Sequence, residues 1–196
     1  MNTMTKTLTI AALSVASAAT LFAAPSAHAA TGSKAACPTP SKAEIKRSYD
    51  SKVDKPARGA TAIKGVRVGR IPKGFTYGGV VAGRHGGVTE YGYQWGDDRA
   101  NADLEQRSLW VRVLCWPDAK KLANLKRLPV TYGTFTGDVK TATIGGRRVL
   151  TKEGDGALGA GRYVGWVERT GVVVTVMAST PLVAELDKII SGIRLP

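Results

Sequence analysis

The sequence predicts an α+β fold: a single antiparallel sheet of about six to seven strands with a C-terminal amphipathic helix packed on one face. Three observations support this prediction. Short segments with alternating apolar residues recur from residue 65 onward, and glycine-containing turns join two pairs of them as in β-hairpins. The chain then closes with an apolar stripe at helical spacing. We therefore expect one α+β domain over residues 65–196.

Residues 1–29 have the order typical of a cleavable secretory signal peptide. Lys6 precedes an uncharged run from Thr7 to Ala24, and Pro25 and the small residues around His28 follow. An uncleaved membrane anchor is the alternative. It needs about 20 strongly apolar residues, whereas alanine, serine and threonine dilute this run. The expected mature protein is secreted and has no transmembrane segment after cleavage.

Residues 30–64 are predicted to form a basic leader that is partly disordered or contains a short helix. Ser41 and Glu44 have the spacing of a helix capping box, and Ile45 and Tyr49 would give the helix one apolar stripe. Proline, glycine and scattered charges then indicate a loop over residues 51–64.

The leader also holds much of the positive charge. The chain has 28 Lys and Arg residues against 15 Asp and Glu residues, a formal net charge of +13. Such a field favours anionic partners, here a cell-wall polymer or an acidic secreted protein rather than nucleic acid. A solvated face that keeps the protein soluble is the alternative. The candidate anion-contacting residues are Lys42, Lys46, Arg47, Lys52, Lys55 and Arg58.

The two cysteines, Cys37 and Cys115, are predicted to form one disulfide. Their even number, their lack of metal-type spacing and the oxidising destination favour this pairing over two free buried thiols. The bond would tie the leader to the strand that contains Cys115.

The first half of the domain contains the most apolar strand. The chain becomes strand-like at Val66 and Val68. Further strands are expected at residues 76–82, 90–95 and 109–116, with a loop at 83–87. The segment 109–116 is apolar on both faces apart from Arg112, which predicts a central strand. Tyr91, Tyr93 and Trp95 share one face; we interpret them as core, with a stacking platform as the alternative.

The second half begins with a short helix over residues 118–128. Expected strands follow at residues 130–135, 140–144, 147–151, 163–168 and 172–177. Thr180 can cap the last helix, and Pro181 suits its first position. The apolar stripe from Leu182 to Ile193 should pack on the sheet.

Several phrases resemble a small sheet-plus-helix domain of unknown function that occurs in exported proteins of Gram-positive actinobacteria. They are IPKGF, YQW, RRVLTKE, YVGWVERTGVVVTV and AELDKIISGI, over about residues 68–194. The resemblance implies a non-enzymatic role in the envelope or in sensing, and it implies no site residues.

No pattern indicates a metal site or a nucleophile. His85, the only histidine after residue 29, lies in a glycine-rich turn without a nucleophile motif, and we interpret it as a solvated loop residue. An acidic cluster lacks the alternation of a calcium loop and is flanked by arginines, which indicates a self-neutralising loop. Its members are Asp97, Asp98, Asp103 and Glu105.

Two further patterns are weak. Glu90, Glu153 and Glu168 could supply the paired carboxylates of a glycosidase, but their separation in space is not readable from sequence. Gly154–Gly159 matches G-x-G-x-x-G, but a predicted strand follows it where a dinucleotide site needs a helix. We expect no cofactor.

The sequence thus favours a secreted, non-catalytic binding or envelope-associated domain that contacts anionic wall polymers or an acidic partner. The alternative is a secreted inhibitor of a protease or another enzyme, with the loop at 83–87 or at 154–161 as its exported segment. A hydrolase is a third class and lacks a motif. The oligomeric state is left open.

Overall fold

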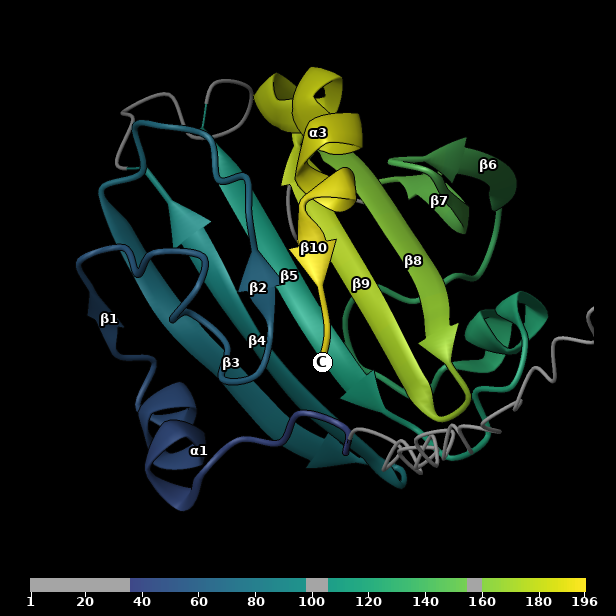
Figure 1. Cartoon of the computed structure of the whole chain (residues 1–196), viewed down its shortest axis with the longest axis horizontal. Helices are drawn as coiled ribbons and strands as arrows, with labels where there is room; N and C mark the ends of the chain where they lie inside the picture. Colours follow the sequence, from purple (N-terminus) through teal and green to yellow (C-terminus); the bar gives the residue numbers. More distant parts are fainter. Residues whose placement is uncertain (1–35, 98–105, 155–159) are drawn as a thin grey trace, which may run out of the picture. The chain divides into compact units, whose positions relative to one another are not determined.

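The computed structural model describes residues 36–97, 106–154 and 160–196, which belong to one unit, Lys34–Pro196 (Figure 1). Its strands are β1 Val53–Asp54, β2 Arg67–Val68, β3 Tyr77–His85, β4 Val88–Gly96, β5 Ser108–Cys115, β6 Lys140–Ile144, β7 Arg147–Glu153, β8 Gly161–Arg169, β9 Val172–Ser179 and β10 Ile193–Arg194. Its α-helices are α1 Lys42–Tyr49 and α3 Leu186–Ser191, and its 3-10 helices are η1 Leu122–Arg127 and η2 Thr180–Glu185.

Eight of the strands form one antiparallel sheet. Their order is β1-β3-β4-β5-β9-β8-β7-β6, while β2 and β10 form a separate antiparallel pair. The predicted α+β class with a C-terminal helix is confirmed, with eight strands in the main sheet where about six to seven were expected. The apolar segment 109–116 forms β5, which lies inside the sheet as predicted.

Tight turns join three pairs of neighbouring strands: β3 to β4, β6 to β7, and β8 to β9. Gly86 and Gly87 connect β3 to β4 with φ of 53° and 80°, a left-handed geometry that glycine adopts without strain. Gly145 and Gly146 do the same between β6 and β7, as predicted. Since β3 runs to His85, the expected loop at 83–87 shrinks to the two-residue turn.

The first face of the sheet, which carries Tyr91, Tyr93 and Trp95 of β4, is fully packed. These side chains are at most 5% exposed, so the core interpretation of the aromatic stripe is confirmed. Buried residues of η2 and α3, among them Leu182 and Ile189, belong to the same cluster. Figure 1 shows β2, β10 and α3 across this face.

The second face is only partly covered. Residues 116–139, including η1, pack Leu125 and Phe135 against β5 and β7–β9. Among the described residues, β3 contributes none to this second cluster. The cover therefore ends before the β3 edge of the sheet.

Four local expectations need correction. Residues 130–135 form no strand, because Gly133 has φ of 70° and Phe135 turns into the second face. The predicted helix at 118–128 is the shorter 3-10 helix η1. The terminal helix starts as the 3-10 helix η2, in which Thr180 is the first residue and no side chain caps the end. The expected loop at 51–64 contains β1, which pairs with β3.

No helix within the described ranges is long and apolar enough to cross a membrane.

Candidate functional site

A groove of about 410 Å³ lies on the second face, over β3, β4 and β5. One wall is the chain from Ser48 to Val53, which follows the outer edge of β3. The opposite wall is Tyr132, from the connection that covers β5. The floor is the alternating set of β3–β5 side chains that faces away from α3.

Glycines make this floor flat. In the YGYQWG run of β4, the aromatic residues point to the first face and Gly92, Gln94 and Gly96 point to the second. A Cβ on Gly92 would lie 2.7 Å from Cγ of Arg112, and a Cβ on Gly96 would lie 2.3 Å from the ring of Tyr77. Both long side chains therefore lie flat over the backbone of β4.

A buried ion pair fixes the floor. Arg112, 3% exposed, donates from Nη1 to Oε1 of Glu90 at 2.9 Å and from Nε to Oγ1 of Thr175 at 3.1 Å. Both terminal nitrogens also donate to the carbonyl oxygen of Tyr132 at 3.2 Å. Because a buried charge needs partners in every direction, these bonds stabilise the guanidinium and hold Tyr132 at the rim.

The rim of the groove is hydrophobic and exposed. Within the described residues, the large hydrophobic side chains that remain exposed are Tyr49 (73%), Val53 (58%) and Tyr132 (52%), and all three line the groove. Trp110 adds a half-buried indole beneath the Arg112 guanidinium. Cζ of Arg112 lies 5.2 Å from the centroid of the indole ring. A gathering of exposed apolar side chains at one place marks a binding surface more often than isolated ones do.

Helix α1 carries Tyr49 and is anchored at both ends. Ser41 and Glu44 form the predicted capping box, and Ser48 Oγ accepts a hydrogen bond from the Ala82 amide at 2.9 Å. Tyr91 Oη donates to Oε1 of Glu44 at 2.6 Å, which joins the helix to the first face. The edge of β3 thus holds the wall of the groove in place.

The Glu44–Tyr91 contact shifts the pKa of both groups. Burial alone would raise the pKa of Glu44, but hydrogen bonds from Tyr91 and Ser41 and the charge of Lys64 outweigh it and lower that pKa. Burial, followed by the hydrogen bond to Glu44, raises the pKa of Tyr91 to about 12. The charged Glu44 and the neutral Tyr91 are therefore the forms that the fold stabilises.

The predicted cations separate into three groups. Lys46 pairs with Asp50 at 3.1 Å, and Arg47 pairs with Asp54. Lys52 lines the groove. Lys42, Lys55 and Arg58 are exposed and do not line it.

The hydrolase candidates also separate. Glu90 and His85 share the groove, and His85 lies over Gly83, where a Cβ would be 2.8 Å from Nε2. Glu168 instead accepts from Arg147 Nε at 3.3 Å and from Trp166 Nε1 at 2.6 Å, while Glu153 pairs with Arg162 at 2.6 Å. The three glutamates therefore do not converge on one site.

Part of the remaining candidates lies outside the described residues. These are Asp98, Asp103 and Glu105 of the acidic cluster and positions 155–159 of the glycine-rich loop. Asp97, which is described, is buried and accepts a hydrogen bond from the Arg107 amide at 2.9 Å. Within the described ranges, no three His, Cys, Asp or Glu side chains come together as a metal site.

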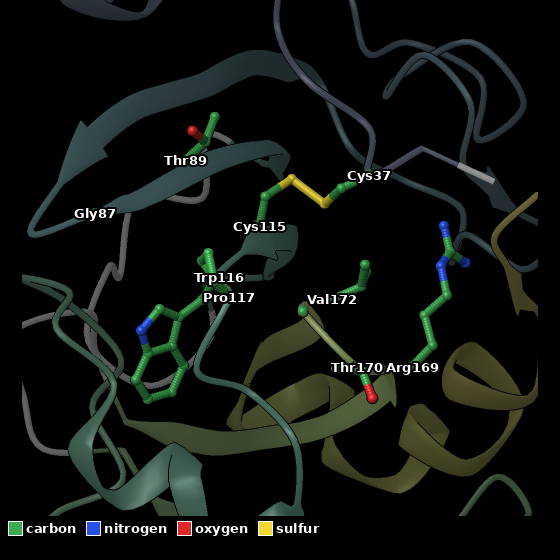
Figure 2. Close-up of a pocket in the computed structure, with 10 residues that line it drawn as sticks. Cys37, Gly87, Thr89, Cys115, Trp116, Pro117, Arg169, Thr170 and Val172 are labelled. Atoms are coloured by element: carbon green, nitrogen blue, oxygen red, sulfur yellow. A yellow bond between two sulfur atoms is a disulfide. The ribbon is translucent and has the colours of Figure 1, made fainter. Parts of the chain in front are cut away.

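The predicted disulfide between Cys37 and Cys115 is confirmed. It borders a second pocket, of about 490 Å³, at the end of β5 and the β8–β9 turn; Figure 2 shows the bond with Trp116 and Arg169 on either side. Arg169 donates to the carbonyl oxygens of Ala36 at 3.4 Å and Pro196 at 3.1 Å. We assign this region to holding the leader and the C-terminus, because its cation is already engaged.

Sequence reasoning missed the groove but not all of its parts. The signal was the alternation of glycine with aromatic residues in β4, and a lone arginine in an apolar strand. What no pattern indicated was that Arg112 would hold Tyr132, 20 residues away along the chain.

None of the protein-family models, curated proteins or solved structures compared with this chain matches it, so the groove is interpreted from its own geometry.

Proposed function

We propose that this chain is an exported, non-catalytic binding protein that holds an anionic polymer of the cell envelope in the groove over β3–β5. The observation that carries the proposal is the convergence of Tyr49, Val53 and Tyr132 on one groove with a fixed polar floor. Ligand sites combine apolar walls with a few placed polar groups in this way, and their volumes run from about 300 to 1,000 Å³.

Export is supported by sequence and by covalent structure. Residues 1–29 have the signal-peptide order, and a disulfide such as Cys37–Cys115 persists in an oxidising compartment. The actinobacterial domain that residues 68–194 resemble likewise implies an envelope role.

The anionic character of the ligand is supported by charge. The chain carries a formal net charge of +13, and Lys52 brings one cation to the groove with no ion pair to another described residue. The Glu90 carboxylate is compensated by Arg112 and so does not repel an anion strongly. A field of this sign raises the local concentration of polyanions.

The test is binding to isolated bacterial cell wall at low and at physiological salt. We expect retention to fall steeply between about 20 and 150 mM salt. We expect K52A to weaken binding about threefold at low salt. The matched control is K188A, which removes the same charge from an exposed lysine of α3. Equal loss in both variants, or binding that ignores salt, contradicts the proposal.

A further inference from the structure

We infer that the ligand of the groove is an acidic glycan, bound through a sugar ring that stacks on the aromatic rim and through an acidic group at Lys52. This inference rests on the proposed function and names the polymer class. Two kinds of ligand, a peptide strand and a lipid chain, do not fit the groove, and the shape of its floor suits a sugar ring.

A peptide strand added to the sheet edge does not fit. β1 already pairs with Gly78 and Gly79, and the Ala82 amide donates to Ser48 Oγ. Strand addition needs a run of free backbone groups along an edge. The edge of β3 is thus occupied over most of the groove.

A lipid chain does not fit either. The floor holds the Glu90–Arg112 pair and the amide of Gln94, which donates to Ser108 Oγ at 3.3 Å. Glu90 and Arg112 are already buried and paired, but hydrocarbon over the half-buried Gln94 amide would remove it from water without offering hydrogen bonds, which is costly. The ligand must therefore carry polar groups as well as an apolar face.

A sugar ring has both an apolar face and polar groups. Its C–H groups form an apolar face that suits aromatic side chains, and its hydroxyl groups point outward in the ring plane, toward polar partners. The groove runs from the β3 edge to β5, two strand spacings or about 10 Å, which admits one ring between its walls. The glycines of β4 keep the floor low enough for that ring.

Charge complementarity selects the acidic member of this class. Lys52 lies in the wall that also carries Tyr49 and Val53, so a ring that contacts this wall brings its substituents near the ammonium group. His85 lies at the groove as well, where its imidazole ring offers a hydrogen-bond donor to an acidic group. A carboxylate on the ring meets this requirement.

The four tryptophans provide a local readout. Trp95, Trp116 and Trp166 are at most 7% exposed, while Trp110 is half-buried in the groove. Ligand that enters the groove should change the emission of Trp110 and leave the other three unchanged. W110F should remove the fluorescence response.

The experiment titrates the full mature protein with four probes at equal concentration of monomer units and at low salt. They are oligogalacturonate, an acidic glycan; polyphosphate, an anion without a ring; dextran, a neutral glycan; and polyglutamate, an acidic peptide. We expect oligogalacturonate to bind at least about tenfold more tightly than the others and to change Trp110 emission. Y132A should weaken it about fivefold, whereas the control Y132F should retain it.

Each other outcome overturns a specific statement. If polyphosphate binds as tightly as oligogalacturonate and Y132A has no effect, the inference of a glycan is wrong, while the proposed binding of an anionic polymer stands. If dextran binds with equal affinity, the ligand needs no acidic group. If polyglutamate binds more tightly than oligogalacturonate, the ligand is an acidic peptide and not a glycan. If wall binding and all four probes fail together while Y132F and wild type remain folded, the proposed function falls with the inference.

Discussion

The two faces of β4 and β5 differ although they are made by alternate residues of the same strands. On the first face, Tyr91, Tyr93 and Trp95 are buried and each polar tip has a partner: Tyr91 Oη with Glu44, Tyr93 Oη with the Ala57 amide at 3.0 Å, and Trp95 Nε1 with the Ala57 carbonyl at 2.9 Å. On the second face, the same strands present glycines, the Glu90–Arg112 pair and a half-buried Trp110.

This difference separates stability from recognition. The first face holds the polar tips of its three β4 aromatic side chains in hydrogen bonds and buries their rings, as a core must. The indole nitrogen of Trp110, in contrast, has no hydrogen-bond partner among the described residues. The first face therefore stabilises the fold, and the β3–β5 part of the second face, which the second cluster covers only in part, is where we propose that a ligand binds.

The largest expected effect comes from removing one tryptophan on each face. W95A should reduce the free energy of unfolding by about 3–5 kcal/mol, because it leaves a large cavity in a packed core. W110A should cost less, about 1–2 kcal/mol, because its ring is only half-buried beside the second cluster and its N–H has no hydrogen-bond partner among the described residues. Urea unfolding of both variants measures the difference.

The pair is internally matched, since both changes remove the same side chain from neighbouring strands. Equal losses would show that the second face is as structural as the first, and the distinction between the faces would be lost.

Much of the first face was predictable and much of the second was not. Period-two spacing placed Tyr91, Tyr93 and Trp95 together, and the apolar run of β5 indicated its central position. These inferences use only neighbours along a strand. The disulfide also followed, from the number of cysteines and from the oxidising compartment that the signal-peptide pattern predicts.

The groove depends on contacts that local patterns do not encode. Val130 and Phe135 are buried at a spacing that fits no period-two pattern, and Gly133 breaks the expected strand with a positive φ. Arg112 is buried because Glu90, Thr175 and Tyr132 reach it from three other segments. Such a constellation exists only once the register of the whole sheet is set.

The disulfide gives the next largest effect and sharpens the comparison. Cys37 packs with the first-face cluster, so the bond belongs to the stabilising face. It joins positions 78 residues apart, and its reduction, or the C37S/C115S pair, should reduce the free energy of unfolding by up to about 4 kcal/mol. Urea unfolding with and without reductant measures this loss.

The groove should be little affected by that reduction under native conditions. Its wall is also held by the Ser48–Ala82 bond and by β1. Trp110 emission and oligogalacturonate affinity should therefore stay within about twofold of the oxidised protein. A larger loss of affinity at full folding would mean that the bond organises the groove.

The smallest expected effect is a pH dependence of the free energy of unfolding, which arises at the Glu44–Tyr91 contact between α1 and the first face. The pKa of Glu44 lies below its ordinary value of 4.5, so its stabilising contribution is complete above that value and is lost as pH falls through the lowered pKa. The pKa of Tyr91 is raised from 10.0 to about 12, so its contribution is lost as pH rises through that interval.

Y91F should cost about 1 kcal/mol at neutral pH, because it removes the hydrogen bonds with Glu44 and with the Lys64 amide at 2.9 Å. It should also flatten both pH flanks of the unfolding free energy relative to wild type. Since α1 carries Tyr49 into the groove wall, acid should lower glycan affinity in wild type before it unfolds the sheet. Parallel pH profiles of wild type and Y91F would show that the helix is held by other contacts, and that the first face does not position the groove.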